Sequence, residues 1–339
     1  MMDILRKLYR RKPLSDQEAR QAFEEIMTGQ TDPIQLGAFL ALMASRPPTV
    51  EELMGAAAAM RRFVIAVQAP PEVIDTCGAG GANSKIFNVS TTAAIVAAAC
   101  GVTVAKHGNQ AVTSRSGSAD VLRELGVNIQ APVDIQERCL REVQLAFCYA
   151  PQHHPAMKHV ADARKALGFP TIFNLIGPLT NPAGAKRQLV GVPTPDLVPL
   201  VAQALWRLGA QRIMVACGHD PEAGLMCELS ISGPTDLCLY ESDEMKKLTL
   251  NPVDVGLATS PSHTLEISSP RQSADMILDV LKGGRGPARD IVLLNSAAAL
   301  WVGMKAKTMS HGIKLAAEAI DSGRARTTLQ KLVDITNAA

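Results

Sequence analysis

The sequence predicts an α/β protein, with a small all-helical domain followed by a large α/β domain around a mainly parallel central sheet. Residues 1–65 show only helical patterns. From Val73 onward, short β-branched runs alternate with helical segments, which is typical of a parallel sheet. A chain of 339 residues is long enough for two domains. We therefore expect a helical domain over residues 1–65 and an α/β domain over residues 70–339.

The N-terminal segment carries two signatures of a helix start. Ser15 with Glu18, and Thr49 with Glu52, match the capping box, in which a hydroxyl and a carboxylate three residues later each accept a backbone N–H. Apolar residues at three- and four-residue spacing follow each signature. Such an all-helical piece ahead of an α/β body forms either a separate lobe or a dimerisation surface.

The elements of the body follow from the spacing of apolar residues. Strands are predicted at residues 102–106, 146–149, 189–192 and 212–217. Helices are predicted at residues 91–100, 118–125, 134–143, 195–208, 273–281, 290–302, 310–321 and 325–334. We also expect short helical pieces at 156–167 and 171–176, and a more antiparallel segment over 228–267.

The most informative stretch, residues 74–127, reads as strand, glycine loop, helix, strand, polar loop and helix. Gly78, Gly80 and Gly81 follow a strand and precede Ser90 and Thr91, which open an apolar helix. Glycines let backbone N–H groups approach a ligand, and a helix start favours an anion. A G-x-G-G loop alone is about as often a plain tight turn as a phosphate site.

A second polar loop follows the next strand. Lys106 and His107 are expected to end that strand, and a loop containing Asn109, Ser114 and Ser118 opens another helix. Two anion-binding helix starts on neighbouring βα units predict a ligand with two phosphate groups. The clustering of so many polar residues in one fold unit favours a binding site over two plain turns.

Composition excludes several functional classes. A net charge of +2 and 4% aromatic residues argue against a nucleic-acid-binding protein. The seven cysteines show no C-x-x-C spacing, as expected in a reducing compartment. The N-terminus lacks the apolar core of a secretory signal, and the longest apolar run, 92–100, is too short to span a bilayer. We expect a cytoplasmic protein that does not bind membranes.

Five motifs resemble those of the anthranilate phosphoribosyltransferase family. They are N-V-S-T (88–91), V-A-K-H-G-N (104–109), S-G-S-A-D-V-L (116–122), A-P-Q-H-H-P-A-M-K-H-V (150–160) and T-I-F-N-L-I-G-P-L-T-N-P-A (171–183). The resemblance implies a nucleoside-phosphorylase-like fold whose small domain also takes in part of residues 160–185, and a homodimer formed through that domain. It implies transfer of phosphoribosyl from 5-phosphoribosyl diphosphate to the amine of anthranilate, a step of tryptophan biosynthesis.

The resemblance also implies roles for individual residues. The donor diphosphate corresponds to Gly78, Gly80, Gly81, Asn88, Ser90, Thr91, Lys106, Ser114 and Ser118. The acceptor corresponds to Gly78, His107, Asn109, His154 and Arg164, with Met157 nearby. Arg164 suits this role because a guanidinium can hold a carboxylate through two parallel hydrogen bonds. Mg²⁺ is the expected cofactor, and Ser90 and Glu228 are its expected ligands.

The chain departs from the family pattern on the donor side. Ala79, Ala82, Ile86 and Gln110 stand where the family has Thr, Asp, Thr and Arg, and Cys227 replaces the aspartate before Glu228. Mg²⁺ prefers oxygen ligands, so a thiol there predicts a weakened metal site. The glycine loop also gains Lys85, and we hypothesise that this lysine partly replaces the metal in neutralising the diphosphate.

Parts of the sequence are also compatible with four other interpretations. The chain could use another aromatic or carboxylate acceptor or another sugar-phosphate donor, or it could be a non-catalytic binding protein on the same fold. The intact run 106–109 speaks against the last of these. A dinucleotide-binding dehydrogenase fails because no acidic residue ends the second strand. A zinc site at His153, His154 and His159 fails because their spacing does not put three ligands on one helical face.

Overall fold

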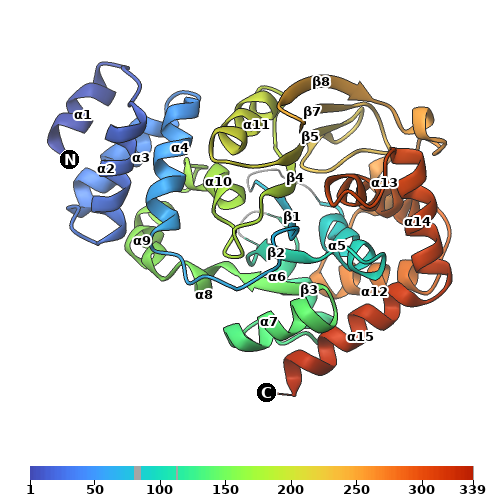
Figure 1. The fold of residues 1–339 in the computed structure, drawn as a ribbon. Helices are drawn as coiled ribbons and strands as arrows, with labels where there is room; N and C mark the ends of the chain where they lie inside the picture. The colour runs from blue at the N-terminus through green and yellow to red at the C-terminus, as the bar shows by residue number, and fades with distance from the viewer. Residues whose placement is uncertain (80–84, 112–113, 339) are drawn as a thin grey trace.

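The computed structural model describes residues 1–79, 85–111 and 114–338. Figure 1 shows a helical bundle on one side of the molecule and a sheet covered by helices on the other. The bundle begins with α1 (Met2–Tyr9), α2 (Asp16–Met27), α3 (Pro33–Ala44) and α4 (Val50–Arg61). Both predicted capping boxes are confirmed: Ser15 and Glu18 cap α2, and Thr49 and Glu52 cap α4.

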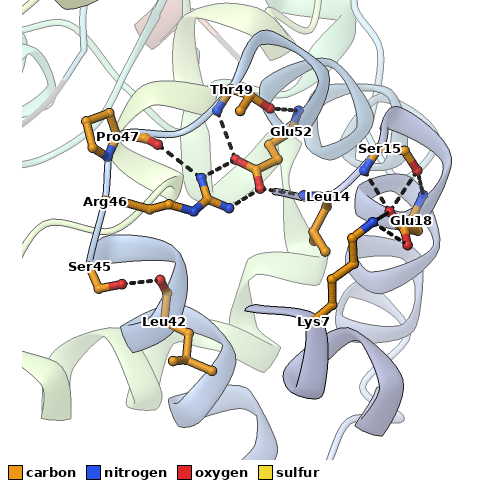
Figure 2. Close-up of polar contacts among 10 residues, drawn as sticks. All are labelled: Lys7, Leu14, Ser15, Glu18, Leu42, Ser45, Arg46, Pro47, Thr49 and Glu52. Atoms are coloured by element: carbon orange, nitrogen blue, oxygen red, sulfur yellow. Dashed lines mark hydrogen bonds and ion pairs between the residues drawn. The ribbon is translucent and has the colours of Figure 1, made fainter. Parts of the chain in front are cut away.

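Glu52 joins three parts of the bundle (Figure 2). Its carboxylate is fully buried and accepts the backbone N–H groups of Leu14, at 2.9 Å, and Thr49, at 2.8 Å. Both terminal nitrogens of the Arg46 guanidinium also donate to it. Burial alone would raise the pKa of Glu52, but Arg46 and the two N–H groups hold it below its usual value. Glu52 therefore ties the start of α4 to Leu14, just before α2, and to Arg46, just after α3.

A segment from the middle of the chain packs against this bundle. It contains α8 (Ala150–His153), a 3-10 turn (Pro155–Met157), α9 (Lys158–Leu167), α10 (Phe173–Ile176) and a second 3-10 turn (Gly177–Thr180). Helix α9 contacts α2 and α3, and the ring centroid of Phe173 lies 5.4 Å from that of Phe23. Figure 1 shows α9 beside the N-terminal helices. The division into domains at residues 1–65 and 70–339 stays a prediction.

The central sheet is mainly parallel, as predicted. Its strands are β1 (Ile74–Gly78), β2 (Val104–Gly108), β3 (Leu145–Tyr149), β4 (Arg187–Gly191), β5 (Arg212–Asp220), β6 (Gly224–Met226), β7 (Thr235–Glu241) and β8 (Glu244–Leu250). Their order is β3-β2-β1-β4-β5-β7-β8, with β6 paired to β5. Strands β1 to β5 pair in parallel, and β6, β7 and β8 pair antiparallel, which confirms the antiparallel segment expected after residue 228.

Helices cover both faces of the sheet. They are α5 (Val89–Ala99), α6 (Ser118–Glu124), α7 (Val133–Glu142), α11 (Leu197–Arg207), α12 (Pro270–Leu281), α13 (Pro287–Val302), α14 (Met309–Asp321) and α15 (Arg324–Asn337). Side chains of β4 alternate between two hydrophobic cores: Leu189 belongs to the core that includes residues of α5 and α13, and Val190 belongs to the core that includes residues of α11 and the helical bundle. The bundle therefore shares one hydrophobic core with a face of the sheet.

The strand order reverses between β1 and β4. From β1 the chain moves to β2 and then β3 on one side, and β4 is added on the opposite side of β1. Ligands of open α/β sheets bind at such a reversal, beyond the carboxyl ends of the strands. Gly78 and Gly191 are register partners at these ends. The topology therefore places Gly78, the first residue of the predicted glycine loop, at the expected binding edge.

No helix in the described part of the chain is long and apolar enough to cross a membrane.

Candidate functional site

A small recess opens at the carboxyl ends of β1, β4 and β5. It is lined by Thr76, Cys77, Ser90, Leu189, Gly191, Ala216, Cys227, Glu228, Leu229 and Asn295. These residues come from β1, the start of α5, β4, β5, the segment after β6, and α13. The recess thus brings together Ser90 and Glu228, the two residues predicted from the sequence to hold a metal.

Lys106 points into this region from β2. Its side chain is 3% exposed, and Nζ donates to the Thr76 carbonyl at 2.5 Å and lies 3.4 Å from the Ser90 Oγ. Burial lowers the pKa of the ammonium, while the negative charges of Asp75 and Glu228 oppose that shift. The ammonium and the first turn of α5 together present positive charge at the recess.

The predicted strand 102–106 stops two residues early, and Lys106 and His107 lie inside β2, next to its last residue. Strand β2 continues to Gly108, and Lys106 and His107 pair with Phe147 and Cys148 of β3. The strand continues because β3 extends equally far and supplies hydrogen-bonding partners. Both polar side chains are therefore held by the sheet, which makes them more rigid than loop residues.

Glu228 is half-buried beside Ser90 and Lys106. Burial raises the pKa of this carboxyl to about 7, against the lowering effects of Lys106 and of hydrogen bonding from Ser90. Cys227, next to it, donates from Sγ to the Ala79 carbonyl at 3.4 Å. The carboxylate is therefore close to the Lys106 ammonium and to the start of α5.

The side chains of Asn88 and Thr91 contact other parts of the protein. Nδ2 of Asn88 donates to the Ser116 carbonyl at 3.1 Å and Oδ1 accepts from Ser273 Oγ at 2.7 Å, so this side chain ties the two polar loops together. Thr91 is 1% exposed, and its hydroxyl has no hydrogen-bond partner in the described part of the chain. It lines a separate apolar cavity beside Leu122.

At the second predicted anion site, the start of α6, a carboxylate of the protein itself accepts backbone N–H groups. Asp120 Oδ2 accepts the Gly117 N–H at 3.0 Å and the Ala111 N–H at 2.8 Å. Ser118 Oγ donates to the Asn109 carbonyl at 3.3 Å, and Ser114 Oγ donates to the Ser116 carbonyl, also at 3.3 Å. The structure therefore does not support a second set of open donors at this helix start. The roles of Ser114, Ser118 and Asn109 stay predictions.

His107 and His154 form a buried pair. Their ring centroids lie 5.0 Å apart, and His107 Nδ1 donates to the Gly177 carbonyl at 3.2 Å. Neither Nε2 has a hydrogen-bond partner among the residues that the structure describes. Burial lowers the pKa of His107 to about 3 and that of His154 to about 4, and the charge of each neighbouring histidine adds to this. Both imidazoles are therefore neutral at physiological pH, and Nε2 of His107 is the acceptor nitrogen of its ring because Nδ1 donates to Gly177.

The remaining predicted residues occupy the edges of this region. Arg164 lies half-buried on α9, with its guanidinium carbon 5.6 Å from the centroid of the Phe173 ring, and burial lowers its pKa. Gly78 is exposed at the end of β1. Lys85 is exposed, and its carbonyl accepts the Ile267 N–H at 2.9 Å. Gly80, Gly81 and Ala82 lie outside the described residues.

Three buried polar residues at the site were missed by the sequence reasoning. Asp75 is fully buried in β1 and accepts the His107 N–H at 3.1 Å, and burial raises its pKa. Asn181 Nδ2 donates to the Ala105 carbonyl at 2.9 Å. Asn295 bonds the backbone of Leu229. Each of the three is a polar residue next to an apolar run, and this pattern was the feature of the sequence that could have indicated a buried polar side chain.

The side-chain oxygens at the recess suit a metal ion that is also coordinated by a bound substrate. Across residues 1–79, 85–111 and 114–338, no three His, Cys, Asp or Glu side chains are grouped to hold a metal ion by themselves. Glu228 and Ser90 nevertheless place a carboxylate and a hydroxyl side by side. Mg²⁺ typically binds one or two carboxylates and completes its shell with water and substrate phosphates. These residues fit Mg²⁺ brought in with a diphosphate.

Two family models match the chain. The helical bundle domain of a glycosyl transferase family matches residues 2–64, and the a/b domain of that family matches residues 70–326. A protein named anthranilate phosphoribosyltransferase from Rhodospirillum rubrum is 44% identical over 327 residues, covering 96% of this chain and 93% of that protein.

Solved structures show the same architecture. An anthranilate phosphoribosyltransferase from Thermus thermophilus superposes with a TM-score of 0.91 at 35% identity, covering 99% of each chain. The Saccharomyces cerevisiae anthranilate phosphoribosyltransferase, solved in complex with PRPP and Mg, has a TM-score of 0.89 at 27% identity, covering 100% of this chain and 98% of that chain.

Proposed function

The chain belongs to the glycosyl transferase family that includes the anthranilate phosphoribosyltransferases, and we propose from this that it transfers phosphoribosyl to anthranilate. The donor is 5-phosphoribosyl diphosphate, and diphosphate is released. In this reaction the bond between ribose C1 and the diphosphate oxygen breaks, a bond from C1 to the amine nitrogen forms, and the amine gives one proton to solvent. The product belongs to tryptophan biosynthesis.

The observation that carries the proposal is the buried Lys106 ammonium next to the start of α5. Negative charge develops on the departing diphosphate in the transition state, and a fixed cation at a helix start stabilises it without reorganising. An aromatic amine is neutral and nucleophilic at neutral pH, so the reaction needs no strong base. Positioning and leaving-group stabilisation are sufficient, and the recess provides groups for both.

We propose that 5-phosphoribosyl diphosphate contacts the protein at the start of α5 and at the end of β1. Lys106 and Ser90 face the diphosphate with the N–H groups of α5, and Gly78 lets the ligand approach the end of β1. Gly80, Gly81, Asn88, Thr91, Ser114 and Ser118 belong to the same proposed donor set. A hydrogen-bonded frame around the recess keeps the two loops adjacent, because Asn88 donates to the Ser116 carbonyl.

For the acceptor we propose Arg164, Asn109, His107 and His154. The guanidinium of Arg164 would hold the carboxylate. His107 presents an acceptor nitrogen at Nε2, because its Nδ1 donates to the Gly177 carbonyl, and such an acceptor suits the donor hydrogens of an amine better than a carboxylate. This supports an arrangement in which the acid of anthranilate faces α9 and its amine faces the sheet.

Mg²⁺ is proposed as the cofactor, held by Glu228 and Ser90 together with the phosphates of the donor. When bound, it would neutralise part of the diphosphate charge. Because Glu228 is the one carboxylate among the described residues lining the recess, we propose that the protein's own contribution to Mg²⁺ binding is weak. Lys85, which is exposed, is proposed to add positive charge to the diphosphate from the solvent side.

We further propose that residues 1–65, with part of 160–185, form one domain and that residues 70–339 form the other. The protein is proposed to be a cytoplasmic homodimer that pairs through the helical domain. Met2, Tyr9 and Ile34 support this, because these large apolar side chains are 50%, 79% and 83% exposed on α1 and α3.

The test is a turnover assay. Purified protein is mixed with 5-phosphoribosyl diphosphate and anthranilate, with and without Mg²⁺, and the loss of anthranilate fluorescence is followed. We expect loss of fluorescence and stoichiometric release of diphosphate. Diphosphate release with a different aromatic acid, and none with anthranilate, would replace the proposed acceptor. Absence of turnover with any acid would refute the proposed activity.

A further inference from the structure

The segment that carries Glu228 is irregular and enclosed. Residues 227–230 follow β6 without forming a helix or strand, and Leu229 and Ser230 are each 1% exposed. Backbone N–H and C=O groups that are buried outside regular structure need other partners. The position of the Glu228 carboxylate therefore depends on whatever supplies those partners.

Strands β4 and β5 lie directly against this segment. A Cβ added to Gly191 at the end of β4 would overlap the Cys227 carbonyl, and a Cβ added to Gly218 of β5 would overlap the Glu228 carbonyl. The sheet therefore limits how far residues 227 and 228 can move in one direction, but these contacts do not hold the segment against the opposite movement.

Asn295 holds the segment from the other side. Its Oδ1 accepts the Leu229 N–H at 3.0 Å, and its Nδ2 donates to the Leu229 carbonyl at 2.9 Å. Nδ2 also donates to the Ile291 carbonyl of α13, at 2.9 Å, which fixes the orientation of the amide. Asn295 is 1% exposed, lines the recess, and pairs both backbone groups of the residue after Glu228.

We propose that Asn295 is a positioning residue for Glu228. Its amide clamps the backbone next to the carboxylate and so sets where that carboxylate stands relative to Ser90 and Lys106. This inference rests on the proposed function, in which Glu228 and the donor diphosphate share Mg²⁺. Among the described residues that line the recess, Glu228 is the one carboxylate, so the site depends strongly on where that carboxylate lies.

The experiment measures donor binding in place of turnover. 5-Phosphoribosyl diphosphate is titrated calorimetrically into the full-length protein at a series of Mg²⁺ concentrations, and the Mg²⁺ concentration giving half-maximal binding is determined. Asn295→Leu keeps a similar side-chain volume and loses both hydrogen bonds to Leu229, and Asn295→Ala loses both bonds and the volume. Residues that orient a metal ligand typically contribute 10- to 100-fold in affinity, so we expect the midpoint to rise roughly tenfold or more in both variants.

Thr336→Val is the matched control. Thr336 is 4% exposed on α15, and its Oγ1 accepts the Asn128 N–H at 3.2 Å, so this variant also removes a bond between a buried helical side chain and a loop backbone. It is expected to lower the melting temperature without moving the Mg²⁺ midpoint. Gly218→Ala disturbs the Glu228 segment without changing Asn295 and is expected to raise the midpoint as the Asn295 variants do.

The outcomes separate the two proposals. Asn295 variants that are less thermostable but keep the wild-type midpoint would overturn the positioning role and leave only a structural one. Failure of the wild-type protein to consume anthranilate counts against the proposed activity alone, because the midpoint is read from donor binding.

Discussion

Acid should destabilise this protein through the buried pair His107 and His154. Both side chains are neutral in the fold, with pKa values lowered to about 3 and about 4, whereas in the unfolded chain each has its ordinary value near 6.5. Below pH 6.5 the unfolded state therefore binds more protons than the folded state. Stability then falls as the pH falls, between pH 6.5 and about pH 3 for His107 and about pH 4 for His154.

The size of the effect follows from the proton count. One proton per histidine corresponds to about 1.4 kcal/mol per pH unit, so the pair should lose roughly 4 kcal/mol of unfolding free energy between pH 7.5 and pH 5. That is a large share of a typical stability of about 5–15 kcal/mol. His153, which is also buried and whose pKa burial also lowers, acts in the same direction.

The assay is thermal unfolding followed by circular dichroism from pH 8 to pH 5, with each variant compared to its own value at pH 7.5. His107→Asn and His154→Asn each remove one titrating ring. Each should therefore shrink the acid-induced drop in melting temperature, and the double variant should shrink it further. An unchanged drop in the double variant would refute the reasoning, because the protons would then be taken up elsewhere.

Three further changes test other parts of the structure. Glu52→Ala leaves Arg46 without its carboxylate and removes the acceptor of two backbone N–H groups, so urea unfolding should show a loss of about 3–5 kcal/mol; a loss below 1 kcal/mol would contradict the ion-pair account. Gly191→Ala should push Cys227 outward and lower kcat roughly 100-fold, with Gly37→Ala, where the added methyl meets open space, as the unaffected control. Lys106→Met should lower kcat/KM for the donor roughly ten- to hundredfold, as expected for a lost charged hydrogen bond, and an increase confined to the KM for anthranilate would contradict its placement.

Much of the fold could be predicted because its local signals are strong. The capping boxes at Ser15 and Thr49 start helices as expected, and the alternation of strands and helices from residue 74 gives the parallel sheet. The end of β2 was predicted at residue 106, two residues early, because two polar residues after an apolar run are typical of the end of a strand. Only the neighbouring strand β3 shows that β2 continues past them.

The candidate site was predicted less completely, since its arrangement depends on contacts between distant residues. Asp120 accepts the N–H groups of Gly117 and Ala111 near the start of α6. The sequence does not predict these contacts, because an aspartate is common in the first turn of any helix. Asn295 stands in an apolar helical run, and its partner Leu229 lies 66 positions earlier. The packing of α9 against α2 and α3 likewise follows from tertiary structure alone.

The central claim is that a diphosphorylated sugar binds where the strand order reverses, against the start of α5. A crystal structure of the protein with 5-phosphoribosyl diphosphate and Mg²⁺ tests this most directly. We predict diphosphate density within hydrogen-bonding distance of Lys106 Nζ and Ser90, with the metal next to Glu228. Density elsewhere on the molecule, or a recess that stays closed by its own side chains at saturating donor, would contradict the account.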